Sequence, residues 1–390
     1  MQNTIYEYES IINQELKNHI IDTKGLHKYF TLDWKDLKTK QYCGILNFNN
    51  QDFYILPKIA NRNSKPDDEQ NLNIFIYMLM YAYDVKLSNE QIASCANQEH
   101  TILEVFVQMF ANGLLQELKK GLYKEYLTKQ DNLPVLKGKY LINENLKYNF
   151  TKNKIYCEYD EFSENNSLNQ FFLYAVKYLQ KFVKDKKLLK QCELIFDEVE
   201  YKQVDINRLE TINFNRLNVR FKISFEIAIL LLKQSIPLFS QDKKSFAFLF
   251  DMNILFEKFI ARMVKSMDVS AKIQNKDSFG DLILKPDIIL QNQIIDTKYK
   301  KLNSLNDIKQ SDKLQAFSYG INYKVKYVTL FYPKHLDEIK YDLVLGKESI
   351  VNLKIRTIDL NFSGNDYKEY IDEIRIKIGE VINECKYIIK

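Results

Sequence analysis

PDIILQNQIIDTKYK, residues 286–300, determines the strand pairing expected in the C-terminal part of the chain. Two apolar runs flank a short polar break, a pattern that predicts a β-hairpin. Gln291 and Asn292 are the expected turn residues, because asparagine tolerates the positive φ that tight hairpin turns require. In that register Leu290 pairs with Gln293, and the pairing of the two strands follows from this contact.

The same register places two carboxylates and an ammonium group on one face of the hairpin. Asp287 lies opposite Asp296, and directly opposed side chains have Cβ atoms roughly 4.5–5.5 Å apart. Lys298 shares the face of Asp296, because side chains alternate along a strand. A chance hairpin with surface charges would give the same pattern. Both aspartates adjoin apolar residues, however, and burying unpaired carboxylates is costly, so the pattern favours a site for a divalent cation and a phosphodiester.

Length and composition indicate a soluble globular protein. The 390 residues are enough for two or three domains, and 46% are hydrophobic and 27% charged. The net charge of +5 is compatible with nucleic acid but too small to identify a nucleic-acid-binding protein. The start of the chain lacks the features of a signal peptide, and no apolar run approaches the roughly 20 residues of a membrane span. We therefore expect a cytoplasmic protein without a membrane segment.

The cysteines and histidines show no metal-binding pattern. The five cysteines form no CxxC pair, and the four histidines have no partner at zinc-ligand spacing. Reduced thiols in a cytosolic protein are the expectation.

The apolar pattern divides the chain into three regions of an α+β protein. Residues 1–165 combine short strands with helices, residues 166–240 form a helical connecting region, and residues 241–390 have the pattern of a mixed sheet flanked by helices. In the first region we expect paired strands over 42–59 joined at Asn49-Asn50, helices over 72–85 and 101–122, and extended chain over 131–162. In the second we expect a helix over 168–199 and another after the 215–218 turn. In the third we expect helices through 255–263 and over 312–322, strands over 326–333 and 351–360, and a helix after residue 365 capped by Ser363 or Asn365.

Two helices carry polar side chains that would lie near the hairpin. Glu257 lies among apolar residues of the helix before the hairpin, where it is either a further metal ligand or part of a solvated face. Gln315 and Tyr319 lie four residues apart on the helix after the hairpin and therefore share a face. They either contact DNA or orient the site; a core-facing tyrosine beside an exposed glutamine is the simpler alternative.

The order helix-Glu, Pro-Asp, Asp-x-Lys, Gln-x3-Tyr resembles the PD-(D/E)xK nuclease superfamily. More closely, the sequence resembles McrC, the nuclease subunit of the McrBC-type, 5-methylcytosine-specific restriction systems. The resemblance is carried by DMNILFEKFI, PDIIL and IIDTKYK, by Asp312, Gln315 and Tyr319 before LFYP, and upstream by LPKI, YMLMYAYD, LKGKY and the Arg216-Leu217-Asn218 turn. It thus spans most of the chain, and its C-terminal motifs are the more specific ones.

This resemblance implies a metal-dependent DNA endonuclease in residues 241–390. Asp287, Asp296 and Glu257, with the backbone carbonyl of Thr297, would hold Mg²⁺, for which Mn²⁺ could substitute. Lys298 would position or activate the attacking water. Oxygen ligands suit Mg²⁺, which keeps several waters and needs only a few carboxylates.

The resemblance also implies a partner that uses GTP. In McrC-like proteins the N-terminal part, here residues 1–165, docks into a McrB-like AAA+ GTPase hexamer that recognises and translocates double-stranded DNA. The chain contains no GxxxxGK[ST] motif and is not expected to bind a nucleotide itself. Cutting both strands implies that two complexes pair. The implied role is defence of a prokaryotic cytoplasm against phage and foreign DNA. A stand-alone nuclease and a non-catalytic regulator of an AAA+ ring are the alternatives.

Overall fold

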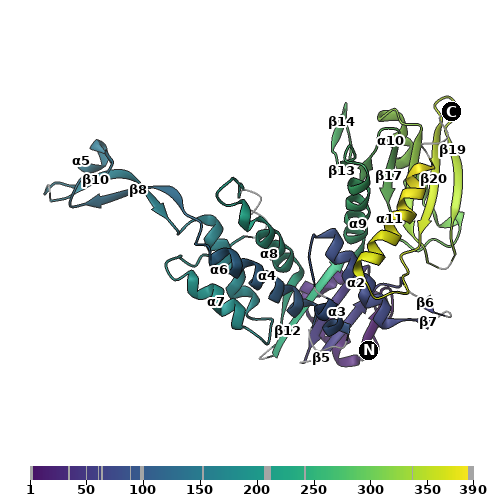
Figure 1. Cartoon of the computed structure of the whole chain (residues 1–390), viewed down its shortest axis with the longest axis horizontal. Helices are drawn as coiled ribbons and strands as arrows, with labels where there is room; N and C mark the ends of the chain where they lie inside the picture. The colour runs from purple at the N-terminus through teal and green to yellow at the C-terminus, as the bar shows by residue number, and fades with distance from the viewer. Residues whose placement is uncertain are drawn as a thin grey trace. The chain divides into compact units, whose positions relative to one another are not determined.

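A strand from the second half of the chain pairs with one from the first 50 residues, and this pairing decides how the chain divides. In the computed structural model β12 (Lys243–Asp251) runs antiparallel to β4 (Tyr42–Phe48). The chain accordingly forms two units, one of residues 1–102 with 236–390 and one of residues 103–235 (Figure 1). The structure describes residues 3–33, 36–49, 51–59, 61–62, 65–87, 89–96, 101–151, 153–205, 212–240, 243–335 and 337–384.

These units have other boundaries than the three regions expected from the sequence, 1–165, 166–240 and 241–390. The apolar pattern predicts β4 but no strand over 243–251, and such a pattern carries no information about pairing across the chain. The functions assigned to the three regions remain predictions.

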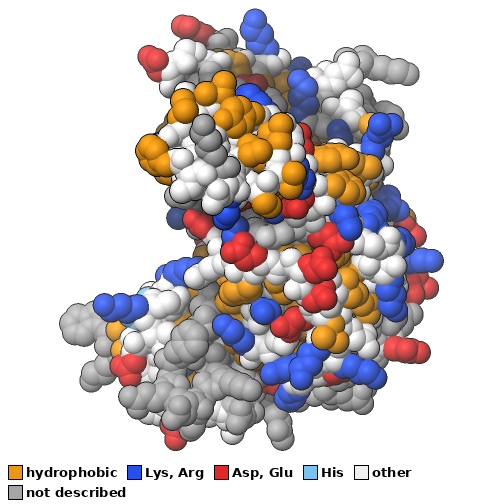
Figure 2. Space-filling view, turned by 90° about the vertical axis from the view of Figure 1, so that its left-hand side faces the viewer, with side chains coloured by type: hydrophobic (Ala, Val, Ile, Leu, Met, Phe, Trp, Pro, Cys, Tyr) orange, Lys and Arg blue, Asp and Glu red, His pale blue; other side chains and the backbone are white. Residues whose placement is uncertain are grey.

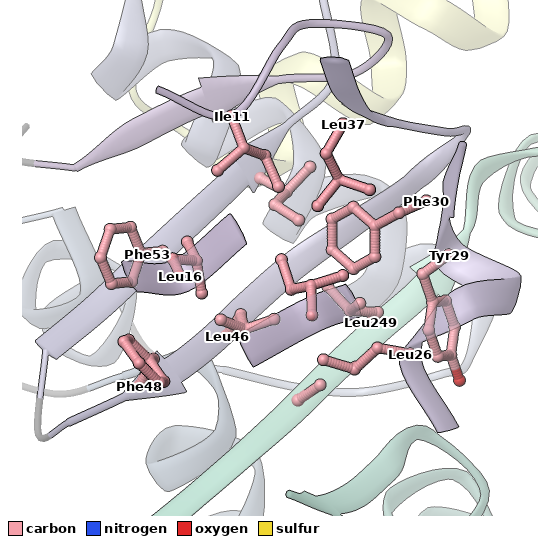
Figure 3. Close-up of a cluster of buried hydrophobic side chains, with 13 residues drawn as sticks. Ile11, Leu16, Leu26, Tyr29, Phe30, Leu37, Leu46, Phe48, Phe53 and Leu249 are labelled. Carbon is pink, nitrogen blue, oxygen red and sulfur yellow. The ribbon is translucent and has the colours of Figure 1, made fainter. Parts of the chain in front are cut away.

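The first sheet has the strand order β1-β5-β4-β12-β11. The expected strand pair over 42–59 is confirmed, because β4 and β5 pair antiparallel around Asn49, which has a positive φ of 51°. Its turn partner Asn50 lies outside the described residues. Hydrophobic side chains from the first 55 residues and from β12, such as Phe30, Leu46 and Leu249, fill the core on this sheet (Figure 3). The elements of this part are β1 (Thr4–Tyr6), α1 (Gln14–Asp22), η1 (Lys24–Tyr29), β2 (Phe30–Asp33), β3 (Asp36–Thr39), β5 (Gln51–Leu56), β6 (Asn61–Arg62), β7 (Lys65–Pro66), α2 (Asp68–Ala82), α3 (Asn89–Ala96) and β11 (Ser235–Ser240).

The second sheet has the order β13-β16-β17-β18-β20-β19 and contains the predicted hairpin. Its two central pairings, β17 with β18 and β18 with β20, are parallel and the others antiparallel. The register is the predicted one, with Ile288 opposite Ile295 and the Leu290 amide donating to the Gln293 carbonyl at 2.9 Å. The elements are α9 (Met252–Met267), β13 (Lys272–Ile273), β14 (Asp277–Phe279), β15 (Leu282–Leu284), β16 (Ile288–Ile289), β17 (Gln293–Thr297), η4 (Leu305–Asp307), α10 (Gln310–Asn322), β18 (Tyr327–Pro333), β19 (Lys340–Leu345), β20 (Val351–Ile358) and α11 (Tyr367–Asn383).

Helices flank this mixed sheet, as the predicted fold class requires. Helix α10 packs on β17, β18 and β20, whereas α11 packs on β20 and on α9, which in turn contacts α2. Residue 366, rather than Ser363 or Asn365, caps α11: the Asp366 side chain accepts hydrogen bonds from the amides of Lys368 and Glu369. An aspartate directly before the helix can reach these amides, which explains the correction.

The second unit consists of helices and one long antiparallel ribbon. Its elements are α4 (Ile102–Leu118), β8 (Glu125–Leu133), β9 (Lys139–Tyr140), α5 (Ile142–Tyr148), β10 (Ile155–Ser163), α6 (Ser167–Leu179), α7 (Lys187–Ile195), η3 (Val219–Phe221) and α8 (Lys222–Gln234). The expected extended chain over 131–162 is confirmed in β8 and β10, but the sequence prediction missed α5 between them. No described helix of either unit has the length and apolarity needed to cross a membrane.

Candidate active site

The hairpin brings Asp287 against the end of β17. One carboxylate oxygen of Asp287, Oδ2, accepts two hydrogen bonds from Thr297, at 2.7 Å from the backbone amide and at 2.7 Å from the hydroxyl. Pro286 directly before it disfavours helix and keeps this segment extended. The bonds fix Asp287 across the hairpin from Asp296, as the sequence register predicts.

Asp296 and Lys298 form an ion pair at the carboxyl end of β17, an interior strand of the sheet. Lys298 Nζ lies 2.5 Å from Asp296 Oδ2, and the Asp296 side chain is only 3% exposed. Burial first, and the charge of Asp287 second, raise the pKa of Asp296 to about 6, although Lys298 acts in the opposite direction. Burial would lower the pKa of Lys298, but Asp296, Asp312 and Asp287 together outweigh burial and the pKa is raised, so the ammonium group stays charged.

Helix α10 holds Lys298 from the other side. Lys298 Nζ donates to Gln315 Oε1 at 3.0 Å, and Gln315 Nε2 donates to the Tyr319 hydroxyl at 2.9 Å. The Tyr319 hydroxyl donates to the carbonyl of Lys285 at 3.2 Å, just before the hairpin. Tyr319 is buried and Gln315 half-buried, and whether this pair orients the site stays a prediction.

Glu257 reaches the same place from α9. Its carboxylate accepts a hydrogen bond from the side chain of Gln274, and the Gln274 amide donates to the carbonyl of Asp287 at 2.8 Å. Burial, followed by the nearby charge of Asp287, raises the pKa of Glu257. Asp287 is therefore the carboxylate that both Asp296 and Glu257 face.

This donor set suits a hard divalent cation, although it is not a closed cage. Within the described residues, no three His, Cys, Asp or Glu side chains gather tightly enough to enclose a metal ion. Mg²⁺ does not require such a cage, because it retains several waters and binds through one or two carboxylates. Carboxylates whose negative charges lie close together become more stable when a cation lies between them. Asp287, Asp296 and Glu257 are the residues that would hold such a cation.

All the residues predicted from the sequence meet at this site: Asp287, Asp296, Thr297, Lys298, Glu257, Gln315 and Tyr319. The carbonyl of Thr297 as a metal ligand stays a prediction, because the described contacts of Thr297 to Asp287 use its amide and hydroxyl. The sequence prediction missed Gln274, whose contact depends on the pairing of β13 with β16. It also left out the ion pair of Lys300 with buried Asp312, at 3.1 Å, although Asp312 belongs to the motif that carries the resemblance.

Comparison with known proteins identifies the family. The family described as McrBC 5-methylcytosine restriction system component matches residues 37–333. A solved chain of the half-complex from the tetradecameric assembly of Thermococcus gammatolerans McrB AAA+ hexamers with bound McrC is similar in fold, with 20% identity and a TM-score of 0.60 over 97% of this chain and 99% of that one.

A chain of the cryo-EM structure of the Thermococcus gammatolerans McrBC complex is 26% identical and has a TM-score of 0.48 over 67% of this chain and 86% of that one. No curated protein matches. Since the family match covers well over half of the sequence, the chain belongs to the family of McrBC 5-methylcytosine restriction system components, as its resemblance to McrC predicts.

Proposed function

We propose that the chain is the endonuclease subunit of a GTP-dependent McrBC-type restriction complex and hydrolyses DNA phosphodiesters with Mg²⁺. The observation that carries this proposal is the convergence of Asp287, Asp296 and Glu257 beside Lys298 at one edge of the second sheet. Three carboxylates and one ammonium group match the needs of a metal ion and a phosphate held together. A non-catalytic regulator would have no use for this arrangement.

Each residue has a defined role in the proposed reaction. Asp287 and Asp296, with Glu257, would hold Mg²⁺, which when bound supplies an activated water and stabilises charge on the phosphate oxygens. Lys298 orients the attacking water and offsets the negative charge that develops on the phosphate. Gln315 and Tyr319 keep the ammonium group in place through their hydrogen bonds.

The variants Asp287→Ala, Asp296→Ala and Lys298→Ala, made singly, test the nuclease proposal. Each is expected to lower cleavage of DNA by at least about 100-fold in the presence of the cognate GTPase, Mg²⁺ and GTP. Stimulation of the GTPase should stay near the wild-type level, because these residues lie in the site and not on a partner surface. Lys313→Ala is the matched control on α10. Retained cleavage by the Asp296 variant would contradict the assignment, and Mg²⁺-dependent cutting without partner or nucleotide would favour a stand-alone nuclease.

The partner is proposed from the solved relative and from one surface of the second unit. That relative is bound to McrB AAA+ hexamers, and we infer a hexameric AAA+ GTPase as the partner of this chain, with two complexes pairing on double-stranded DNA. Strands β8 and β10 pair over nine residues each and, with α5, form an arm. Hydrophobic side chains are exposed on this arm, among them Val135, Ile142, Leu146 and Phe150. Figure 2, viewed from the side that lies at the left of Figure 1, shows hydrophobic side chains gathered on the surface.

The arm lies within the predicted docking region, residues 1–165. Two lysines of the arm contact neighbouring side chains: Lys137 Nζ lies 3.9 Å from the Tyr159 ring centre, and Lys139 lies 3.9 Å from Glu158. Exposed apolar side chains are therefore better candidates for the contact than the lysines beside Gly138. Water-exposed clusters of this kind mark interaction surfaces.

The arm proposal is tested by placing charges on its apolar side chains. The double variant Leu146→Glu, Phe150→Glu should lower stimulation of the cognate GTPase and co-purification with it by about tenfold or more. Leu194→Glu, at an equally exposed leucine on α7, is the control and should leave both unchanged. Unchanged stimulation by the double variant would place the interface elsewhere.

A further inference from the structure

Gln274 has a strained backbone next to the carboxylates. Its φ is 48°, in the left-handed region that residues other than glycine, asparagine and aspartate rarely adopt. Asparagine adopts this backbone conformation at a lower energetic cost than glutamine, yet the chain has glutamine at position 274 and asparagine only at position 275. Strain of this kind gathers at functional sites, where surrounding contacts enforce it.

The end of a helix does not explain this strain. Lys324 has a similar φ of 55°, but it lies just beyond the C-terminal end of α10. There the amide of the next residue, Val325, donates to the Gly320 carbonyl at 3.1 Å. A left-handed residue is the usual way to end a helix. Gln274 follows a strand instead, so its conformation needs another reason.

The reason lies in the two contacts that Gln274 makes. Its backbone amide donates to the carbonyl of Asp287 at 2.8 Å, and its side-chain amide donates to the carboxylate of Glu257. The side chain is exposed, so burial does not force it into this position. One residue thereby connects the segment that carries Asp287 with the helix that carries Glu257.

We propose that Gln274 is a positioning residue that holds the Glu257 carboxylate toward Asp287, and that the left-handed backbone at Gln274 is what allows it to contact both. This inference rests on the proposed metal site. Groups that orient metal-binding side chains typically change metal affinity 10- to 100-fold when they are removed.

The experiment measures binding of Mn²⁺ to the full chain by electron paramagnetic resonance, without DNA or partner. Gln274→Met keeps the length of the side chain and removes the donor, and Gln274→Gly removes both the donor and the backbone strain. Both are expected to weaken Mn²⁺ binding by about tenfold or more. Gln274→Gly should melt at the wild-type temperature or above, which separates positioning from folding. Lys324→Gly relieves the same strain away from the site and should bind Mn²⁺ like wild type.

Two reference variants separate failure of this inference from failure of the proposed site. If wild type does not bind Mn²⁺, or if Asp287→Ala and Glu257→Ala bind it as well as wild type, the metal site is wrong and the role of Gln274 fails with it. If both reference variants weaken binding but the two Gln274 variants do not, only the role of Gln274 is overturned. Wild-type affinity in Gln274→Gly with a loss confined to Gln274→Met would also overturn it.

Discussion

At the scale of the residue, Asp296 sets the pH at which the site can accept a cation. Its pKa is raised to about 6 by burial and by Asp287. The protonated form, which prevails below that pH, is a poor ligand, so metal affinity should be nearly constant above about pH 7 and fall about tenfold per pH unit well below pH 6. Calorimetric titration of the DNA-free chain with Mg²⁺ at several pH values measures this affinity. Equal affinity at about pH 5 and about pH 7.5 would contradict the prediction.

Single-residue predictions from the sequence succeed where local periodicity determines the geometry. Asp296 and Lys298 share a face because they alternate on a strand, and Gln315 and Tyr319 do so because they are one helical turn apart. The role of Gln274 could not be predicted, because it depends on a positive φ and on contacts with two distant segments. Neither leaves a periodic signal.

At the scale of the element, Gly44 allows β4 to approach β12. Its φ is 147°, and a Cβ atom at this position would lie 2.1 Å from the backbone oxygen of Phe248. Backbone atoms in a paired strand cannot move aside easily, so Gly44→Ala should destabilise the chain by about 2–4 kcal/mol.

Chemical denaturation of the full chain measures the free energy of unfolding of the variant. Gly25→Ala is the control, because a Cβ there would meet no atom within 4 Å. Equal stability of the two variants would show that β12 does not approach β4 as described.

A second element-scale prediction concerns the end of α11. Glu384 accepts hydrogen bonds from Arg356 Nε at 2.8 Å and from Lys340 at 2.6 Å, and Arg356 is buried. Burial would raise the pKa of Glu384, but these bonds outweigh it and the pKa is lowered. A lowered carboxylate pKa contributes stability that is present above the unfolded pKa of roughly 4.3 and lost as the pH falls through the folded value.

Glu384→Gln removes this contribution. It should cost about 1–2 kcal/mol at neutral pH, a modest value because the Glu384 side chain is 25% exposed and water screens the pair. The difference from wild type should shrink as the pH falls below about 4. Chemical denaturation at several pH values measures this difference in the free energy of unfolding. A difference that does not depend on pH would contradict the prediction.

The element scale also shows the limit of apolar patterns. They predict the strands of 42–59 and the hairpin correctly, because each pair is adjacent in sequence. They cannot predict that β12 completes the sheet of β4, since nothing local to either strand specifies a distant partner. Helix α5 was missed because it is only seven residues long and follows Pro134 and Gly138, which interrupt a helical pattern.

At the scale of the whole molecule, the first unit joins both ends of the sequence. Tyr299, the residue directly after Lys298, is buried, and its hydroxyl donates to the Glu7 carboxylate at 2.9 Å. The Tyr77 hydroxyl donates to the carbonyl of Asn365 at 2.8 Å. Residues before 103 are thus part of the first unit, and a chain that lacks residues 1–165 is not expected to fold as a separate nuclease domain. Such a deletion would uncover β12 and one face of α9 and remove the partner of Tyr299.

The two units predict a different truncation that should succeed. Replacing residues 103–235 by a flexible linker of about 10 residues removes the arm but leaves every strand pair of the first unit in place. The shortened chain should unfold in one cooperative transition and bind Mn²⁺ within about threefold of wild type, yet fail to stimulate the cognate GTPase. The chain that begins at residue 166 is the comparison and should lack a cooperative transition, because its second sheet has lost α2 and its first sheet has lost β4. A cooperative transition in that chain, or GTPase stimulation by the linker variant, would mean that the assignment of folding or of partner contact to these units is incorrect.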